Sequence, residues 1–149
     1  MPVRFQLVID CHDPRRLVDF WSAALQYQPE PPPKGHAGWR EYWMSIGVPE
    51  DDVRDVTGPE SIEDPNGEGP RIWFHAVPES KNCKNRLHID VRASESRELP
   101  LATRKARVEA EAARLAALGA TRVETNFEEG VDHYAVAMAD PEGNEFDVF

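Results

Sequence analysis

The chain has 149 residues, of which 27 are acidic and 17 are basic, so its formal net charge is −10. A chain this acidic repels nucleic acid and anionic membrane surfaces, so we expect neither as a partner. No apolar run approaches the roughly 20 residues that span a bilayer, and the length fits one domain over residues 1–149. Cys11 and Cys83 lie far apart in the sequence, which predicts free thiols in a reducing cytoplasm.

The first half of the sequence opens with a predicted strand followed by a predicted helix. VRFQLVI alternates apolar and polar residues and is rich in branched side chains, as is typical of a strand. Asp13 followed by Pro14 suits the start of a helix that ends near Gln26, before the prolines of residues 29–33. The apolar face of that helix would comprise Leu17, Phe20, Trp21, Ala24 and Leu25.

Three further segments complete the first half. GWREYWMSIG, residues 38–47, predicts one or two strands around its aromatic residues. Residues 49–69 hold eight carboxylates with three prolines and three glycines, which predicts a long solvated acidic loop. PRIWFHAV, residues 70–77, predicts another strand.

The second half has the same order of predicted elements. NRLHIDV, residues 85–91, is expected to form a strand with Leu87, Ile89 and Val91 on its apolar face. The next segments are a helix over 104–119 with Val108, Ala112 and Leu115 facing inward, strands over 120–127 and 133–139, a DPEG turn, and a closing strand over 144–149.

The order strand, helix, strand, strand, strand therefore occurs twice, and short echoes of sequence accompany it. FQLVID and LHIDV place Gln6 and His88 between apolar neighbours, while PRIWFHAV and NEFDVF match His75 with Asp147. We interpret the chain as an internal duplication, with module one at about 1–80 and module two at about 84–149.

The four matched polar residues offer the chemistry of a metal site. Two imidazoles, a carboxylate and an amide oxygen, from His75, His88, Asp147 and Gln6, suit a divalent first-row metal. They would leave a position open for substrate or water. Asp90 and Glu145 are alternative carboxylates for this site. Each of the four matched residues could instead face solvent or form an ordinary hydrogen bond.

The motifs IDCHDPRRLVDFWSAAL, VPESKNCKNRLHIDV and DPEGNEFDVF give the chain a family resemblance. It resembles the vicinal oxygen chelate superfamily of glyoxalase I, fosfomycin and bleomycin resistance proteins and extradiol dioxygenases, and most of all its small bacterial glyoxalase-like domain proteins. The resemblance implies an α+β fold in which two βαβββ modules form a curved, incomplete barrel around a central cavity. It also implies metal ligands in the first and last strand of each module, here Gln6, His75, His88 and Asp147.

Departures from the family pattern disfavour two of its activities. His75 and Asp147 stand where glyoxalase I has glutamate, and Gln6 stands where an iron-dependent extradiol dioxygenase has histidine. The resemblance therefore implies a metal-dependent lyase or isomerase of unassigned substrate, with a dioxygenase less expected. The metal would be nickel, iron, zinc or manganese, and Glu145 is the candidate general base.

A second set of residues suggests a ligand pocket. Trp39, Trp43 and Trp73 could wall a flat or aromatic ligand, or they could simply pack a core. Arg86 could grip the carboxylate of an acidic substrate, or it could be a solvated residue at a strand end. The alternative function is thus a metal-free protein that binds an aromatic or drug-like molecule, as in bleomycin resistance, and an interaction domain is a third reading. We expect a small-molecule ligand and either a monomer or a homodimer.

Overall fold

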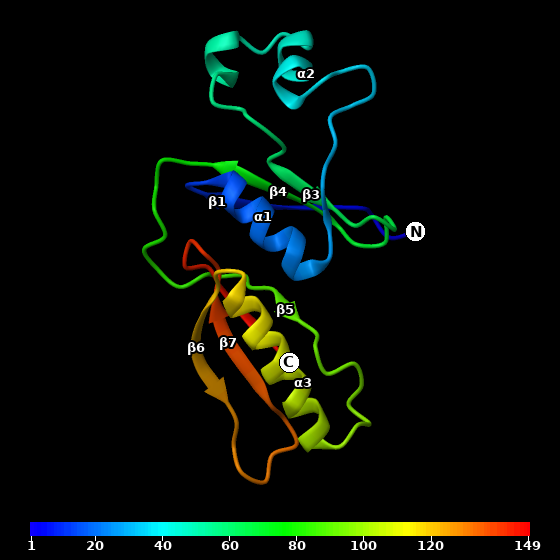
Figure 1. Ribbon diagram of the computed structural model, residues 1–149, viewed down its shortest axis with the longest axis vertical. Helices are drawn as coiled ribbons and strands as arrows, with labels where there is room; N and C mark the ends of the chain where they lie inside the picture. Colours follow the sequence, from blue (N-terminus) through cyan, green and yellow to red (C-terminus); the bar gives the residue numbers. More distant parts are fainter. The chain divides into compact units, whose positions relative to one another are not determined.

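The computed structural model describes residues 1–149, and the chain divides into two compact units, Met1–Glu79 and Ser80–Phe149 (Figure 1). Unit 1 contains β1 (Gln6–Cys11), α1 (Pro14–Leu25), β2 (Gln28–Pro29), α2 (Trp39–Ser45), η1 (Glu50–Val53), β3 (Ser61–Glu63) and β4 (Arg71–Ala76). Unit 2 contains β5 (Asp90–Val91), α3 (Leu101–Ala117), β6 (Thr121–Asn126), β7 (Ala135–Ala139) and β8 (Glu145–Val148).

Unit 1 is a four-stranded mixed sheet with α1 on one face. The strand order is β1-β4-β3-β2, with β1 parallel to β4 and the other pairs antiparallel. The predicted start of α1 is confirmed, because the Asp13 carboxylate accepts a hydrogen bond from Arg16 N at 3.1 Å. The apolar side of α1, including Leu17 and Trp21, is buried with Ile72 and Phe74 of β4. The opposite face of β4 carries Arg71, Trp73 and His75, and we call it the polar face.

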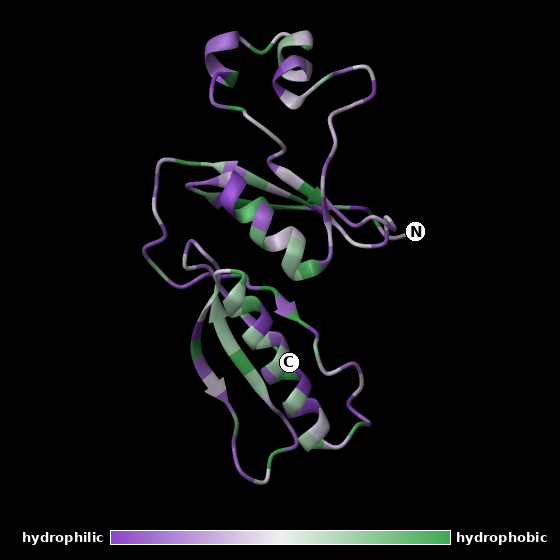
Figure 2. Ribbon diagram, viewed as in Figure 1, coloured by the Kyte–Doolittle hydropathy of each residue, from purple (hydrophilic) through white to green (hydrophobic).

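Unit 2 repeats this arrangement with its own strands. Its order, β5-β8-β7-β6, matches that of unit 1 position by position, so the predicted duplication of the βαβββ order is confirmed. Val108, Ala112 and Leu115 of α3 are buried as expected, and hydrophilic and hydrophobic stretches alternate along this helix (Figure 2). Neither sheet closes into a barrel by itself. No helix of the protein combines the length and the apolar character needed to cross a membrane.

The prediction of strands over residues 38–47 is wrong, because Trp39–Ser45 form the helix α2. Trp39, Tyr42 and Trp43 are spaced three and four residues apart, which brings their rings together on one helical side. The ring centroids of Trp39 and Trp43 are 5.8 Å apart, and those of Tyr42 and Trp43 are 5.2 Å apart. Enrichment in aromatic residues favoured a strand, whereas their spacing indicated a helix.

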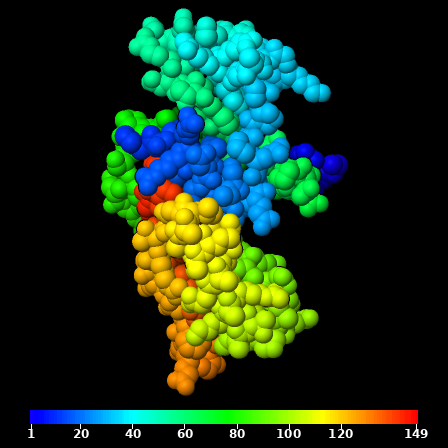
Figure 3. Space-filling model, in the orientation of Figure 1, coloured from blue at the N-terminus to red at the C-terminus, as the bar shows by residue number.

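The prediction of an irregular loop over residues 49–69 is also wrong in part. Glu50–Val53 form the short helix η1, and Ser61–Glu63 form β3, which pairs with both β2 and β4. Val53 and Ile62 are buried, so apolar burial and strand pairing together hold parts of this strongly acidic segment in place. In unit 1 the residues around α2 and η1 form a distinct bulge beyond the sheet (Figure 3).

The strand predicted over residues 85–91 is shorter in the structure. β5 comprises only Asp90 and Val91, although Ile89 O already accepts a hydrogen bond from Asp147 N at 3.0 Å. The Leu87 side chain is 84% exposed, so it does not join the apolar face that the alternation predicted. His88 therefore lies in the irregular segment that leads into β5, not within a ladder.

Candidate functional site

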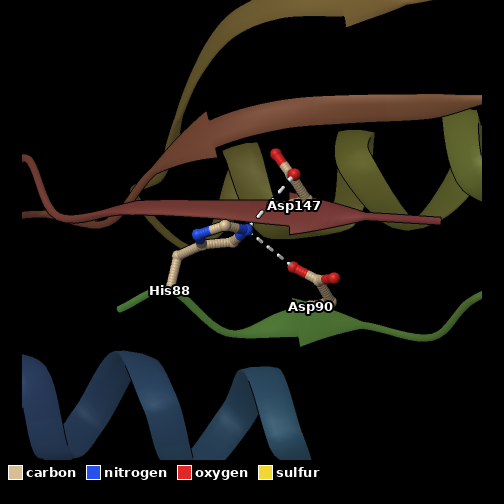
Figure 4. A group of neighbouring side chains, drawn as sticks. All are labelled: His88, Asp90 and Asp147. Carbon is tan, nitrogen blue, oxygen red and sulfur yellow. Dashed lines mark ion pairs between the residues drawn. The ribbon is translucent and has the colours of Figure 1, made fainter. Parts of the chain in front are cut away.

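The polar face of the unit 2 sheet brings three candidate metal ligands together. Asp90 of β5 and Asp147 of β8 are direct partners in a parallel pair, so their side chains lie on the same face. His88 precedes Asp90 by two residues. The imidazole Nε2 lies 3.2 Å from Asp90 Oδ1 and 3.8 Å from Asp147 Oδ2 (Figure 4). We call these three residues the His88 group.

The His88 group fits the requirements of a divalent metal. One ligand atom from each residue lies within 4.8 Å of the others. Bonds of about 2.0–2.2 Å in a tetrahedral shell would place neighbouring ligand atoms roughly 3.3 Å apart, and the imidazole Nε2 lies 3.2 Å and 3.8 Å from the two carboxylates. Side-chain exposures of 42%, 53% and 32% for His88, Asp90 and Asp147 leave room for water or substrate. An imidazole and two carboxylates suit zinc, iron, nickel or manganese.

The two predicted ligands of unit 1 are not brought together. Gln6 pairs with Arg71, whereas His75 pairs with Asp10, four positions further along the same two strands. At about 3.3 Å per residue, Gln6 and His75 are separated by roughly 13 Å along the sheet. Gln6 Oε1 accepts a hydrogen bond from Arg71 Nη1 at 2.7 Å, and His75 Nδ1 lies 3.1 Å from Asp10 Oδ1. Each already has a partner of its own, and their role as metal ligands stays a prediction.

The strand registers show that the sequence match between the two modules is partly wrong. Gln6 lies four positions before the partner of His75, whereas His88 lies two positions before the partner of Asp147. The matches of Gln6 with His88 and of His75 with Asp147 are therefore two residues out of step and cannot both hold. If Gln6 corresponds to His88, the residue that corresponds to Asp147 is Trp73.

Glu145, the predicted general base, anchors a neighbouring segment. Its carboxylate accepts hydrogen bonds from Lys81 Nζ at 2.8 Å and from Asn85 N at 3.0 Å. The Lys81 ammonium and the Asn85 amide lower the pKa of Glu145 from 4.5 to about 2. A carboxylate with so low a pKa is a weak base, and its contacts instead fix the start of the segment that carries His88.

The three tryptophans of the predicted ligand pocket line a single cavity in unit 1. The cavity has a volume of about 210 Å³. Trp39 and Trp43 come from α2 and Trp73 from the polar face of β4, with Gln6, Glu60 and Arg71 among the polar side chains around them. Trp39 Nε1 donates to Glu30 O at 2.9 Å, which fixes α2 to the chain just after β2. Arg86, the fourth predicted pocket residue, is exposed in unit 2 and is not part of this lining.

The sequence model of a family described as a glyoxalase-like domain matches residues 6–149, which is nearly the whole chain. The chain belongs to the glyoxalase-like domain family. No curated protein matches it in sequence. Solved structures of the wider vicinal oxygen chelate superfamily share its fold, as the sequence resemblance implies.

Two of these glyoxalase-like structures illustrate the likeness. A glyoxalase/bleomycin resistance protein/dioxygenase family enzyme from Burkholderia phytofirmans is 16% identical, with 96% of this chain and 94% of that chain covered and a TM-score of 0.56. A variant of the fosfomycin resistance protein FosX from Listeria monocytogenes, complexed with Mn(II) and a dihydroxypropylphosphonic acid, is 10% identical. Its coverage is 99% of this chain and 90% of that chain, with a TM-score of 0.60. At these identities the likeness shows the fold alone.

Some residues of this glyoxalase-like chain gain importance only from the structure. Asp90 was an alternative carboxylate, and its pairing with Asp147 is what brings it to His88. Glu60 fell within the predicted acidic loop, yet it lines the tryptophan pocket. Arg71 belongs to no sequence motif, yet its guanidinium contacts Gln6, Ser61 and Glu30 on the polar face. The sequence signal for Asp90 is that it follows His88 by two residues, a spacing that places two side chains on the same face of a strand.

Proposed function

We propose that the protein is a metal-dependent glyoxalase-like enzyme of the lyase or isomerase type, which acts on a small oxygen-rich molecule. The observation that supports this is the convergence of His88, Asp90 and Asp147 on one exposed point of the unit 2 sheet. A histidine between two carboxylates on a half-exposed sheet face has open space for further ligands. A structural neighbour of the same fold, the FosX variant from Listeria monocytogenes, is complexed with Mn(II), which is consistent with this chemistry.

Each residue of the His88 group has a distinct role in the proposal. His88 supplies a nitrogen donor, and Asp90 and Asp147 supply negative charge that favours a divalent cation. A bound metal would act as a Lewis acid toward two oxygens of the substrate and stabilise negative charge that develops on them. Gln6 and His75 were candidate ligands from unit 1, but they lie too far apart along the sheet for both to bind one metal. Glu145 acts in the proposal as a positioning residue through Lys81 and Asn85, because its low pKa makes it a weak base.

Elemental analysis of protein purified without a histidine tag tests the metal proposal. We expect close to one equivalent of nickel, iron, zinc or manganese after loading, and its loss in His88→Ala and in Asp147→Asn. His133→Ala is the matched control, since His133 is exposed in the connection before β7. Absence of metal from the loaded wild type, or equal metal in His88→Ala and His133→Ala, would rule out the proposed site.

The tryptophan pocket supports a second candidate function, that of a small-molecule binding protein without a metal. Three indole rings line a cavity of about 210 Å³, and aromatic walls with a few polar groups are typical of ligand sites. Quenching of tryptophan fluorescence by a library of small aromatic compounds tests this function. Binding that persists in metal-free protein would favour it, whereas no quenching by any compound would count against it.

Two finer features belong to the same proposal. Cys11 is buried and Cys83 is exposed, and neither forms a disulfide, which supports a reducing compartment such as the cytoplasm. The protein would act as a monomer or a homodimer, and its mass in solution by light scattering distinguishes the two.

A further inference from the structure

The tryptophan pocket of unit 1 contains a carboxylate that no lysine or arginine neutralises. Glu60 lines the pocket together with Trp39, Trp43 and Trp73, and no lysine or arginine forms an ion pair with it. Burial raises its pKa above 4.5, opposed by the Trp73 side chain, which hydrogen-bonds the carboxylate, and by nearby His75. Glu60 is therefore a half-buried carboxylate beside aromatic rings, with His75 as its neighbouring base and no lysine or arginine paired to it.

The one cation of the pocket lining is already neutralised. Arg71 Nε and Nη2 lie 2.7 Å and 2.6 Å from Glu30 Oε2, and Arg71 Nη1 donates to Gln6 Oε1 at 2.7 Å. Arg71 Nη2 also donates to Ser61 Oγ at 3.0 Å. With Arg71 paired to Glu30, the charge of Glu60 remains, so the pocket carries a net negative charge.

We propose that this pocket binds a small organic cation, an ammonium group substituted with methyl or other small alkyl groups. The indole faces of Trp39, Trp43 and Trp73 would attract the cation through their π electrons, and Glu60 would supply the opposite charge. The proposal rests on the second candidate function, because it names the class of ligand for the same pocket.

Size and charge favour such a cation over other ligands. A volume of about 210 Å³ is smaller than the roughly 300–1,000 Å³ of sites for drug-sized ligands, so a compact group fits better. An anion would lie against Glu60, since Arg71 is already held by Glu30. The acidic segment 49–69, which contributes Val56, Gly58 and Glu60 to the lining, would also draw cations toward the pocket.

Calorimetric titration with three probes tests the proposal on the full chain. The probes are choline, its uncharged isostere in which a tert-butyl group replaces trimethylammonium, and indole as a neutral aromatic. We expect choline to bind about tenfold more tightly than the isostere. Glu60→Gln should weaken choline about tenfold and leave the isostere unchanged, which also shows that the variant is folded. Glu79→Gln, an exposed change of the same charge in unit 1, should alter neither.

The outcomes separate the ligand class from the binding function. Equal affinities for choline and the isostere, or equal choline affinities for Glu60→Gln and Glu79→Gln, would overturn the cation proposal. Binding of indole without binding of choline would overturn it while leaving the pocket as a site for neutral aromatics. If none of the three probes binds, the cation proposal is wrong, and the fluorescence library then decides the second candidate function. Metal binding at the His88 group is measured separately and is not affected by these results.

Discussion

Replacement of Ile62 by alanine would show whether the acidic segment 49–69 contributes to the sheet. Ile62 is fully buried, with 0% exposure, and pairs with Pro29 on one side and with Ile72 on the other. The substitution removes three carbons, and at about 0.8 kcal/mol for each the transfer cost is roughly 2.4 kcal/mol. The residual cavity adds to this, so we expect the free energy of unfolding to fall by about 3–4 kcal/mol.

Urea unfolding followed by circular dichroism measures this loss. Ile46→Ala is the matched control, because Ile46 is 55% exposed in the same unit and its loss should cost under about 0.5 kcal/mol. If Ile62→Ala were as stable as Ile46→Ala, β3 would not be part of the sheet. The irregular loop that the acidic composition predicted would then be the better description.

Three further predictions concern single interactions. The pKa of Glu145 falls from 4.5 to about 2 on folding, so its contribution to stability is present above pH 4.5 and is lost as the pH falls toward 2. Urea midpoints at pH 7 and pH 3 should thus differ less in Glu145→Gln and in Lys81→Met than in the wild type, and an unchanged difference would contradict this. Asp13→Ala removes the cap of α1 and should cost about 1 kcal/mol, measured by urea unfolding against the wild type. Gly119→Ala should cost about 1–2 kcal/mol in the same assay, because φ is +115° and the new Cβ would meet only Pro141 Cγ at 3.7 Å.

Periodicity and end signals predicted β1, α1 and β4 in unit 1, and α3 and β6 to β8 in unit 2. The Asp13 cap and the inward face of α3 were readable from local sequence. Predictions failed where composition competed with spacing. The aromatic residues of α2 favoured a strand by type although their spacing was helical, and the acid around Ile62 concealed a short strand that long-range pairing stabilises.

The sequence predicted which types of residue form the candidate site, but not how the strands bring them together. His88 and Asp147 stood out because each is a polar residue between apolar neighbours, and the structure brings them to 3.8 Å. The repeat could not show the strand registers, and a shift of two residues leaves the inward and outward alternation of a strand unchanged. For this reason the sequence pattern could not reveal that His75 pairs with Asp10, far along the strand from Gln6.

The bulge of α2 and η1 lines the ligand pocket of unit 1 but is not part of its sheet. It lies between β2 and β3, supplies Trp39 and Trp43 to the pocket, and contributes no strand to the sheet. Loop-closure entropy changes slowly with length, so this connection can be lengthened or shortened at small entropic cost if the buried Val53 side chain is kept. Unit 2 has no helix at the matching place between β6 and β7. The segment between β2 and β3 is thus a natural point for grafting, where new binding preferences could be introduced by evolution or design without rebuilding the sheet.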